Sequence, residues 1–380
     1  MTAEGMDALL IYSWKRGLVR YLSGYHPNYL ANVALAVLPR AGAPALRIRF
    51  PFDLERARRE SWIEDVAACA GGLANLILES VNVLRRGGLA GGRIGLAAGD
   101  NVIEELPYTL YALLKQELPE AELVEAGHLL RKARHLKSPA EFAKLRAAAN
   151  LADAGIAAAR QVIRPGCNEY EVVGAVEGEL RRLGAEMHLV VISSKGESEL
   201  IGPPEAKIIQ PGDSVILEVA VQRLGYTAQV ARVFFPGKPT PAQIEIYRAT
   251  YAAYQAAVNA ARLGNPPAKP AGTVAPAKPA GTVACADLAG AIREELDRHH
   301  LSDIRLSEYL EQDMGHGIGI DLPEPPRIEK EDRTLLEPGM ALVIHPAVRV
   351  PGVGGAFLGG TVLIHASGPE PLHVIPESPV

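Results

Sequence analysis

Short apolar runs that alternate with helix-like stretches mark the first third of the chain. Three of these runs predict buried strands, at residues 8–13, 32–39 and 44–50. Apolar residues recur at steps of three and four in two longer stretches, which predicts helices at 52–69 and 101–117. A glycine-rich turn precedes another apolar run at 94–98. We therefore expect an α/β domain at residues 1–132.

A helix-capping pattern opens the second part of the chain. Ser138 precedes Pro139 and stands three residues before Glu141, as in a capping box at the start of a long, alanine-rich helix. Asn168 begins the next helix in the same way. Strand-like runs and one further helix follow, the strands at 188–194, 214–221, 230–237, 341–348 and 361–365 and the helix at 287–299. These elements predict a second domain at residues 133–380.

Composition and charge narrow the class of protein. The 380 residues are 48% hydrophobic and 22% charged, which is typical of a globular chain and excludes a disordered one. The formal net charge of −5 disfavours a nucleic-acid partner. The 3 cysteines form no CxxC pair, so neither a disulfide framework nor a cysteine zinc site is indicated. Because no apolar run is long enough to span a membrane and the first residues lack a secretory pattern, we expect a cytoplasmic protein.

One segment is duplicated without change. The nine residues PAKPAGTVA occur twice in succession between residues 267 and 284. Proline at this density prevents a helix, and the period is too short for a solenoid repeat. The duplication therefore predicts a loop insertion on the surface.

Several ordered segments carry a family resemblance. GHGIGIDLPEPPRI at 315–328 and LEPGMALVIHP at 336–346 stand near the end, and LKSPAEFAKLRAAANLAD, IRPGCNEYEVVGAVEGEL and IIQPGDSVILEVAV precede them in order. The chain resembles the creatinase and aminopeptidase P family over nearly its whole length. The resemblance implies a small N-terminal α/β domain, a C-terminal pita-bread domain of mixed α/β class, and a homodimer.

The resemblance also implies which residues stand at the family's metal-binding positions. In the family's peptidases, two aspartates, one histidine and two glutamates hold two divalent metal ions. The corresponding residues here are Glu218, Gln229, His316 and His345, and the fifth position falls near Gly359. Of these, His316 alone keeps the family's residue. A neutral amide and a glycine cannot neutralise two dications, so we expect no cofactor, or at most one divalent metal ion bound by Glu218, His316 and His345.

The family's proton-handling histidines are replaced as well. The resemblance places Ile201 and Pro323 at those positions, and neither side chain can move a proton. Creatinase, which works without metal, uses a histidine where this chain has Ile201. By these residues the chain is neither a typical peptidase of the family nor a creatinase.

Three interpretations of the remaining polar residues stay open. His316, His345 and Glu218 could bind one metal ion, or one of the histidines could act as a metal-free acid or base oriented by Glu218 or Glu324. In the third interpretation, the pocket is degenerate and its polar groups only bond one another. Residues expected to bind substrate are Gln229, Glu324, Arg327 and Tyr226, with Tyr25, His26, Asn28 and Tyr29 as selectivity candidates in the first domain.

From these residues we expect, first, a metal-independent, non-peptidase enzyme that cleaves a carbon–nitrogen or related bond in a small polar molecule. His316 and His345 would be its acid and base, and Glu218 would orient them. The alternatives are a mononuclear-metal hydrolase or Xaa-Pro peptidase, and an inactive pseudo-peptidase that binds a ligand.

Overall fold

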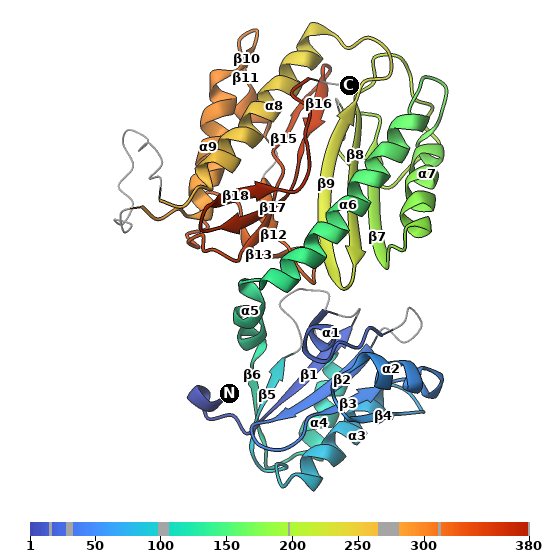
Figure 1. The fold of residues 1–380 in the computed structure, drawn as a ribbon, viewed down its shortest axis with the longest axis vertical. Helices are drawn as coiled ribbons and strands as arrows, with labels where there is room; N and C mark the ends of the chain where they lie inside the picture. The colour runs from blue at the N-terminus through green and yellow to red at the C-terminus, as the bar shows by residue number, and fades with distance from the viewer. Residues whose placement is uncertain are drawn as a thin grey trace. The chain divides into compact units, whose positions relative to one another are not determined.

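The computed structural model describes residues 1–14, 17–27, 33–97, 106–196, 198–264, 281–310 and 313–378. This part of the chain divides between His135 and Leu136 into two compact units (Figure 1). The boundary expected at residue 132 falls within helix α5, Gly127–His135. Most of the duplicated PAKPAGTVA segment lies outside the described residues.

The N-terminal unit is built on one mixed sheet with the strand order β4-β3-β2-β1-β5-β6. Its strands are β1 Ala8–Trp14, β2 Val33–Pro39, β3 Ala45–Ile48, β4 Asp65–Ala68, β5 Arg93–Ala97 and β6 Glu122–Glu125. Its other helices are α1 Gly17–Ser23, α2 Leu54–Glu60, α3 Leu73–Arg86 and α4 Tyr108–Glu117. Strand β1 is antiparallel to β2 and parallel to β5. The strands expected at 8–13, 32–39, 44–50 and 94–98 are confirmed.

Both faces of this sheet are covered, which explains why its strands read as continuous apolar runs. Leu10 and Tyr12 of β1 join one core with residues of α3 and α4. Leu9 and Ile11 join a second core with residues of α1, α2 and α5. Successive side chains of β1 therefore point into two different cores, and the strand shows no alternation of apolar and polar residues in the sequence.

Two helix predictions in this unit need correction. The helix expected at 52–69 ends at Glu60, and Asp65–Ala68 instead forms β4. Parallel pairing of β4 with β3 outweighs the helical spacing there. The helix expected at 101–117 is α4 and begins at Tyr108, while residues 101–105 lie outside the described part of the chain.

The C-terminal unit is built on a longer, curved sheet with the order β13-β12-β14-β17-β9-β8-β7, and β18 pairs with β17. Its strands are β7 Met187–Ser193, β8 Val215–Arg223, β9 Tyr226–Phe234, β12 Gly315–Gly317, β13 Glu324–Arg327, β14 Ala341–Ile344, β17 Gly359–His365 and β18 Gly368–Pro371. Two short hairpins accompany it, one of β10 His300–Leu301 with β11 Ile304–Arg305 and one of β15 Ala347–Val350 with β16 Gly354–Phe357. The strand-like runs of the second domain are confirmed.

Four helices are described in this unit: α6 Pro139–Val162, α7 Glu169–Arg182, α8 Pro241–Ala260 and α9 Cys285–Arg298. The capping boxes predicted at Ser138 and Asn168 are confirmed, because each side chain accepts a hydrogen bond from the backbone N–H three residues on. Helix α8 was not predicted, although Thr240 forms the same kind of cap with Gln243.

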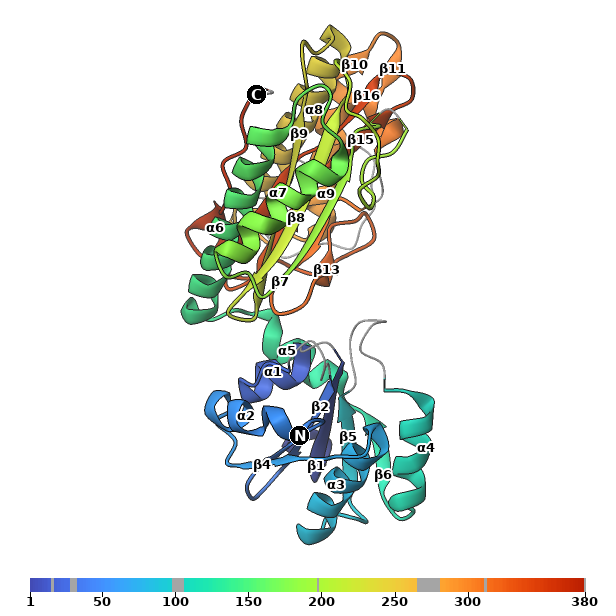
Figure 2. The ribbon, with the colours of Figure 1, turned by 90° about the vertical axis from the view of Figure 1, so that its right-hand side faces the viewer.

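The two pairs of helices cover different parts of this sheet. Helices α6 and α7 pack on β7, β8 and β9 and lie over these strands in Figure 2. Helices α8 and α9 share a core with β14 and β17. Leu217 and Val219 of β8 belong to the α6–α7 core. Glu218 between them consequently points to the opposite face of the strand.

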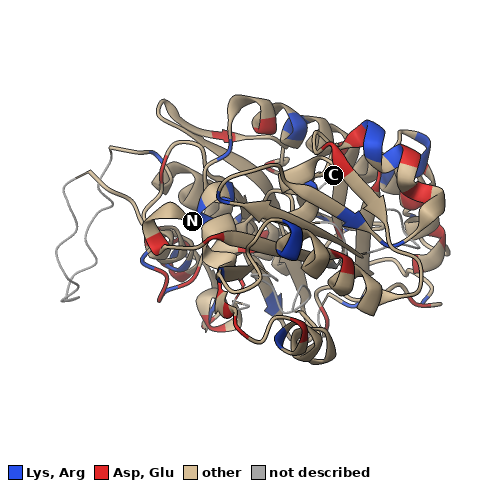
Figure 3. Cartoon of the chain, turned by 90° about the horizontal axis from the view of Figure 1, so that it is seen from below, with Lys and Arg blue, Asp and Glu red and all other residues tan. Residues whose placement is uncertain are grey.

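Positively and negatively charged residues are interspersed over the described part of the chain (Figure 3). Figure 3 shows basic and acidic residues mixed along the chain, and in α2 they pair directly, as Arg58 with Glu55 and Arg56 with Glu60. Among the described residues, no helix is long and apolar enough to cross a lipid bilayer.

Candidate active site

Strands β8 and β9 bring Glu218 and Gln229 together. Their antiparallel register pairs Ala220 with Gln229. Glu218 lies two residues from Ala220, so its side chain emerges on the same face as that of Gln229. Both residues are buried, and the Gln229 side-chain amide donates a short hydrogen bond to Glu218 Oε1.

Strands β12 and β14 supply the two histidines from the other end of the sheet. The register pairs His316 with Val343, and His345 follows two residues later, directly after β14. The rings of His316 and His345 meet edge to face with their centroids 5.2 Å apart. Phe357 covers the far side of the His345 ring at 5.0 Å. Four residues predicted from the sequence thus lie on one sheet.

A pocket of about 530 Å³ opens over these four side chains. Its polar lining consists of Glu218, Gln229, Asp313, His316 and His345. Its apolar lining includes Leu189, Leu200, Ile201, Leu322, Pro323 and Phe357. A concave apolar site with a few convergent polar groups is the usual form of a small-molecule binding site.

Burial governs the protonation of Glu218. Removal from water raises the pKa of its carboxyl group to about 7, and the negative charge of Asp313 acts in the same direction. Gln229 donates to this carboxyl group, while its own Oε1 is buried without a hydrogen-bond partner among the described residues. Gln229 therefore keeps a buried acceptor that no described group satisfies.

The two histidines are held in the neutral form. Burial lowers the pKa of both rings, and the proximity of His345 lowers that of His316 further. Nδ1 of His316 lies 2.9 Å from the carbonyl oxygen of Gly317, which can only accept, so Nδ1 carries the hydrogen and Nε2 keeps its lone pair. Neither ring nitrogen of His345 has a hydrogen-bond partner within the described residues. Both rings are thus able to accept a proton.

Asp313 is a pocket residue that the sequence analysis missed. It stands just before β12, and its carboxylate accepts a hydrogen bond from the backbone N–H of Gly315. Arg327 on β13 is opposite His316 in the register, and its guanidinium lies 3.5 Å from Asp313. Arg327 is therefore placed beside the pocket. The one faint signal for Asp313 in the sequence is an acidic residue three positions before His316.

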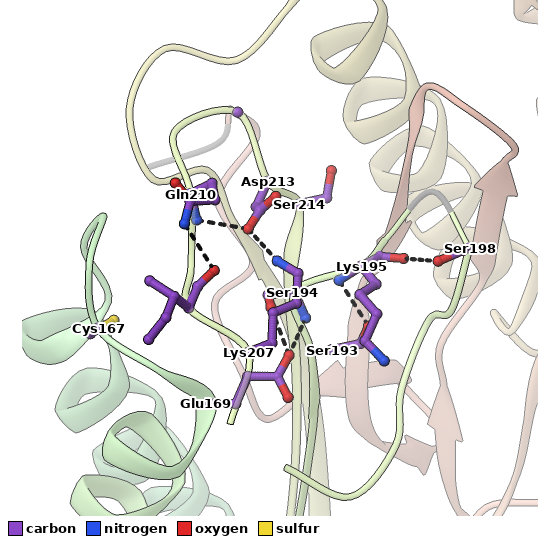
Figure 4. A network of polar contacts seen from close by, with 12 residues as sticks. Cys167, Glu169, Ser193, Ser194, Lys195, Ser198, Lys207, Gln210, Asp213 and Ser214 are labelled. Atoms are coloured by element: carbon purple, nitrogen blue, oxygen red, sulfur yellow. Dashed lines mark hydrogen bonds and ion pairs between the residues drawn. The ribbon is translucent and has the colours of Figure 1, made fainter. Parts of the chain in front are cut away.

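The pocket wall that carries Leu200 and Ile201 is fixed by a buried carboxylate. Glu169, the first residue of α7, accepts hydrogen bonds of 2.7 Å from both the backbone N–H and the hydroxyl of Ser194 (Figure 4). Its second oxygen accepts from the backbone N–H of Glu205 at 2.8 Å. The Glu169 side chain thus joins Ser194 and Glu205, the residues on either side of Leu200 and Ile201 in the sequence, to the start of α7.

Glu324, expected to bind substrate, is engaged elsewhere. Its carboxylate pairs with Lys137 at 2.9 Å in a buried contact and accepts hydrogen bonds from the backbone N–H groups of Ile320 and Asp321. It does not belong to the pocket lining. The sequence did not reveal Lys137 as its partner, because 187 residues separate the two.

The remaining candidates also lie outside the lining of this pocket. Tyr226 donates to Glu141 at 2.7 Å. Tyr25 is fully buried in the N-terminal unit and donates to Asp53, and the backbone N–H of His26 donates to Glu60. Asn28 and Tyr29 lie outside the described residues.

Comparisons with known proteins decide the family. The family model described as metallopeptidase family M24 matches residues 143–366, which hold the pocket, and the model described as the creatinase/prolidase N-terminal domain matches residues 1–136. The chain belongs to metallopeptidase family M24. The expected fold of a creatinase-type N-terminal domain and a pita-bread domain is thereby confirmed.

Several relatives of this M24 chain are named Xaa-Pro dipeptidase. An Xaa-Pro dipeptidase of Pyrococcus horikoshii is 28% identical over 273 residues, which cover 70% of each chain. One of Pyrococcus furiosus matches with the same identity over 70% of this chain and 71% of its own. The crystal structure of the prolidase from Pyrococcus horikoshii is 25% identical and superposes with a TM-score of 0.80, covering 99% of this chain and 96% of that one.

These relatives overturn the first functional expectation. A metal-independent, non-peptidase enzyme was expected because the metal-binding and proton-handling positions carry other residues. That expectation is wrong, since relatives that match more than two thirds of this M24 chain are Xaa-Pro dipeptidases and the full-length structural match is a prolidase. The alternative, an Xaa-Pro peptidase, has the better support.

The pocket of this M24 chain does not supply the donors that two metal ions need. Gln229 offers a neutral amide whose N–H is directed at Glu218. Gly359 has no side chain, and a Cβ added there would overlap the carbonyl oxygen of Ile344 and lie 2.6 Å from Cα of His345. Across the described ranges, no three His, Cys, Asp or Glu side chains are arranged to hold a metal ion. The residues present do not fit a dinuclear centre.

Proposed function

We propose that this chain is an Xaa-Pro peptidase-type hydrolase whose pocket receives a short peptide with proline in the second position. The observation that carries the proposal is a pocket within the M24 domain that combines apolar walls with Glu218, Gln229, His316 and His345 on its floor. The names of the relatives supply the substrate class.

The shape and lining of the pocket support a dipeptide ligand. About 530 Å³ lies within the usual range for small-ligand sites. Leu322, Pro323 and Phe357 provide apolar surface for a proline ring, and Glu218, Gln229, His316 and His345 supply polar lining. The guanidinium of Arg327 beside the pocket suits the C-terminal carboxylate.

We assign the proton-handling roles to the floor of the pocket. His316 and His345 are neutral at pH 7 because burial lowers their pKa, so either can take a proton from an attacking water molecule. Glu218, with a pKa of about 7, can hold or release a proton near neutral pH. Gln229 orients Glu218 through its hydrogen bond.

The test is release of free proline from Ala-Pro by purified protein, measured after chelation and again after addition of Mn²⁺, Co²⁺ or Zn²⁺. We expect hydrolysis in at least one condition and a loss of about 100-fold in kcat for His345→Ala. The matched control is His300→Ala, at an exposed histidine outside the pocket, which should keep full activity. Full activity of His345→Ala would contradict the assigned role.

A second candidate, a pseudo-peptidase that binds such peptides without cleaving them, is favoured by one specific observation. Gln229 and Gly359 leave the family's metal positions short of donors. This candidate predicts saturable binding of Ala-Pro with no release of proline in any of the metal conditions. Detectable turnover that depends on His345 would exclude it.

We also infer that the chain forms a homodimer, as the family resemblance predicted, and that it works in the cytoplasm, as the sequence pattern predicted. Both statements remain predictions. Light scattering on the purified protein measures the mass of the assembly, and a mass of 40.5 kDa, that of one chain, would contradict the dimer.

A further inference from the structure

The rim of the pocket carries a carboxylate that the proposed reaction leaves unused. Asp313 lines the pocket, and its side chain is 57% exposed. One carboxylate oxygen accepts a hydrogen bond of 3.2 Å from the backbone N–H of Gly315. The group is therefore anchored to the sheet while it remains accessible to a ligand in the pocket.

Asp313 dominates the charge of the pocket lining. The lining holds one other carboxyl group, that of Glu218, which is buried and accepts a hydrogen bond from Gln229. The carboxylate of Asp313 is the exposed one of the two. A cationic group on a ligand would consequently be drawn to the Asp313 side of the pocket.

The contact between Asp313 and Arg327 is long and exposed, so a ligand can displace it. Their charged groups are 3.5 Å apart, longer than a charge-assisted hydrogen bond, and the Arg327 side chain is 45% exposed. An exposed pair of this kind contributes little to stability. A ligand that carries both an ammonium and a carboxylate group can therefore replace the pair, one charge for each partner.

We propose that Asp313 binds the free α-ammonium group of the substrate and restricts the pocket to peptides with an unblocked N-terminus. This inference rests on the proposed function, because a dipeptide with its carboxylate at Arg327 has an ammonium group as its other charged end. Asp313 is then a specificity-determining residue. It does not touch the bond that is cleaved.

The test compares two uncleavable ligands by calorimetry: the ketomethylene isostere of Ala-Pro and its N-acetyl form, which has no ammonium group. The wild-type protein should bind the free-amine ligand about 10-fold more tightly than the acetylated one. In Asp313→Asn the preference should fall to about 1, with the affinity for the acetylated ligand unchanged. Asp313→Glu, which keeps the charge, should retain most of the preference.

Asp303→Asn is the matched control, because it removes an exposed aspartate of the same unit that does not line the pocket. It should bind both ligands as the wild type does. A preference that survives in Asp313→Asn would overturn the inference and leave the proposed function intact. Failure of the wild-type protein to bind either ligand would overturn the proposed function, and the inference with it.

Discussion

Glu218 is a carboxyl group that folding removes almost completely from water. Its pKa rises from the ordinary 4.5 to about 7, mainly through burial. The folded state therefore binds this proton more tightly than the unfolded chain does. The contribution of Glu218 to stability is most favourable below pH 4.5 and is lost as the pH rises through about 7, at a cost of roughly 3 kcal/mol.

The first prediction concerns Glu218→Gln, which replaces the ionisable group by a neutral one of the same size. In chelated protein, the variant should match the wild type near pH 4, below the pKa of the unfolded chain, and be more stable by roughly 3 kcal/mol at pH 8. Urea titrations across this range measure the free energy of unfolding. Glu329→Gln, at an exposed glutamate, is the control and should leave the pH dependence unchanged. Equal pH dependence in Glu218→Gln and wild type would refute the shift.

Single site residues could be predicted from the sequence where the residues around them form a recognisable motif. Glu218, Gln229, His316 and His345 could be placed because each lies in a recognisable strand or glycine-flanked turn, and all four line the pocket. Asp313 could not be assigned to the site from the sequence, since its role depends on which pocket lies beside strand β12, which follows it. Glu324 was assigned to substrate because the sequence does not show that Lys137 reaches it.

Strand β17 shows how close backbone packing limits an element. At Gly359 the strand runs against the end of β14 so tightly that no Cβ can be accommodated beside Ile344 and His345. The atoms that a Cβ would meet are backbone atoms of Ile344 and His345, which cannot rotate away as a flexible side chain does. The absence of a side chain is therefore a requirement of the sheet.

The second prediction follows from this packing. Gly359→Ala should destabilise the protein by about 3 kcal/mol, because the added methyl group forces the two strands apart. Gly290→Ala in α9 is the matched control, since a Cβ there meets nothing within 4 Å, and alanine should stabilise that helix by up to about 1 kcal/mol. Denaturant midpoints of the two variants should move in opposite directions. A Gly359→Ala midpoint equal to that of the wild type would contradict the packing argument.

Helices and strands could be predicted from the sequence where interactions between nearby residues determine their type and their ends. The starts of α6 and α7 follow from Ser138 and Asn168, whose side chains cap the helix within three residues. Residues 65–68 were assigned wrongly because their strand exists only through pairing with β3, a contact that local periodicity does not encode. Helix α8 escaped notice despite its own capping box at Thr240.

For the whole molecule, the resemblance that spans both domains predicted the architecture, and it proved more informative than the few positions at the metal site. The substitutions at Gln229 and Gly359 pointed away from a peptidase, whereas the relatives matched over 70% of the chain point towards one. The residues at the metal-binding positions indicate which cofactor the pocket can hold. They do not by themselves settle which substrate a pocket of this family accepts.

The third prediction is a metal content below two ions per chain. Purified protein, dialysed against a metal-free buffer and analysed for Mn, Fe, Co and Zn, should hold no dinuclear complement, because the pocket has too few anionic donors for two dications. A mononuclear site would appear as one ion per chain that disappears in His316→Ala. Two tightly bound ions would show that the donors rearrange on binding.

Gly359 has a consequence for the history and the engineering of this scaffold. A single substitution to glutamate at this position would strain the sheet before it could contribute a donor, so the step towards a two-metal site costs stability. The strands would first have to separate through changes elsewhere. Laboratory evolution that seeks such a site should therefore begin with the backbone around β14 and β17 and introduce new donors last.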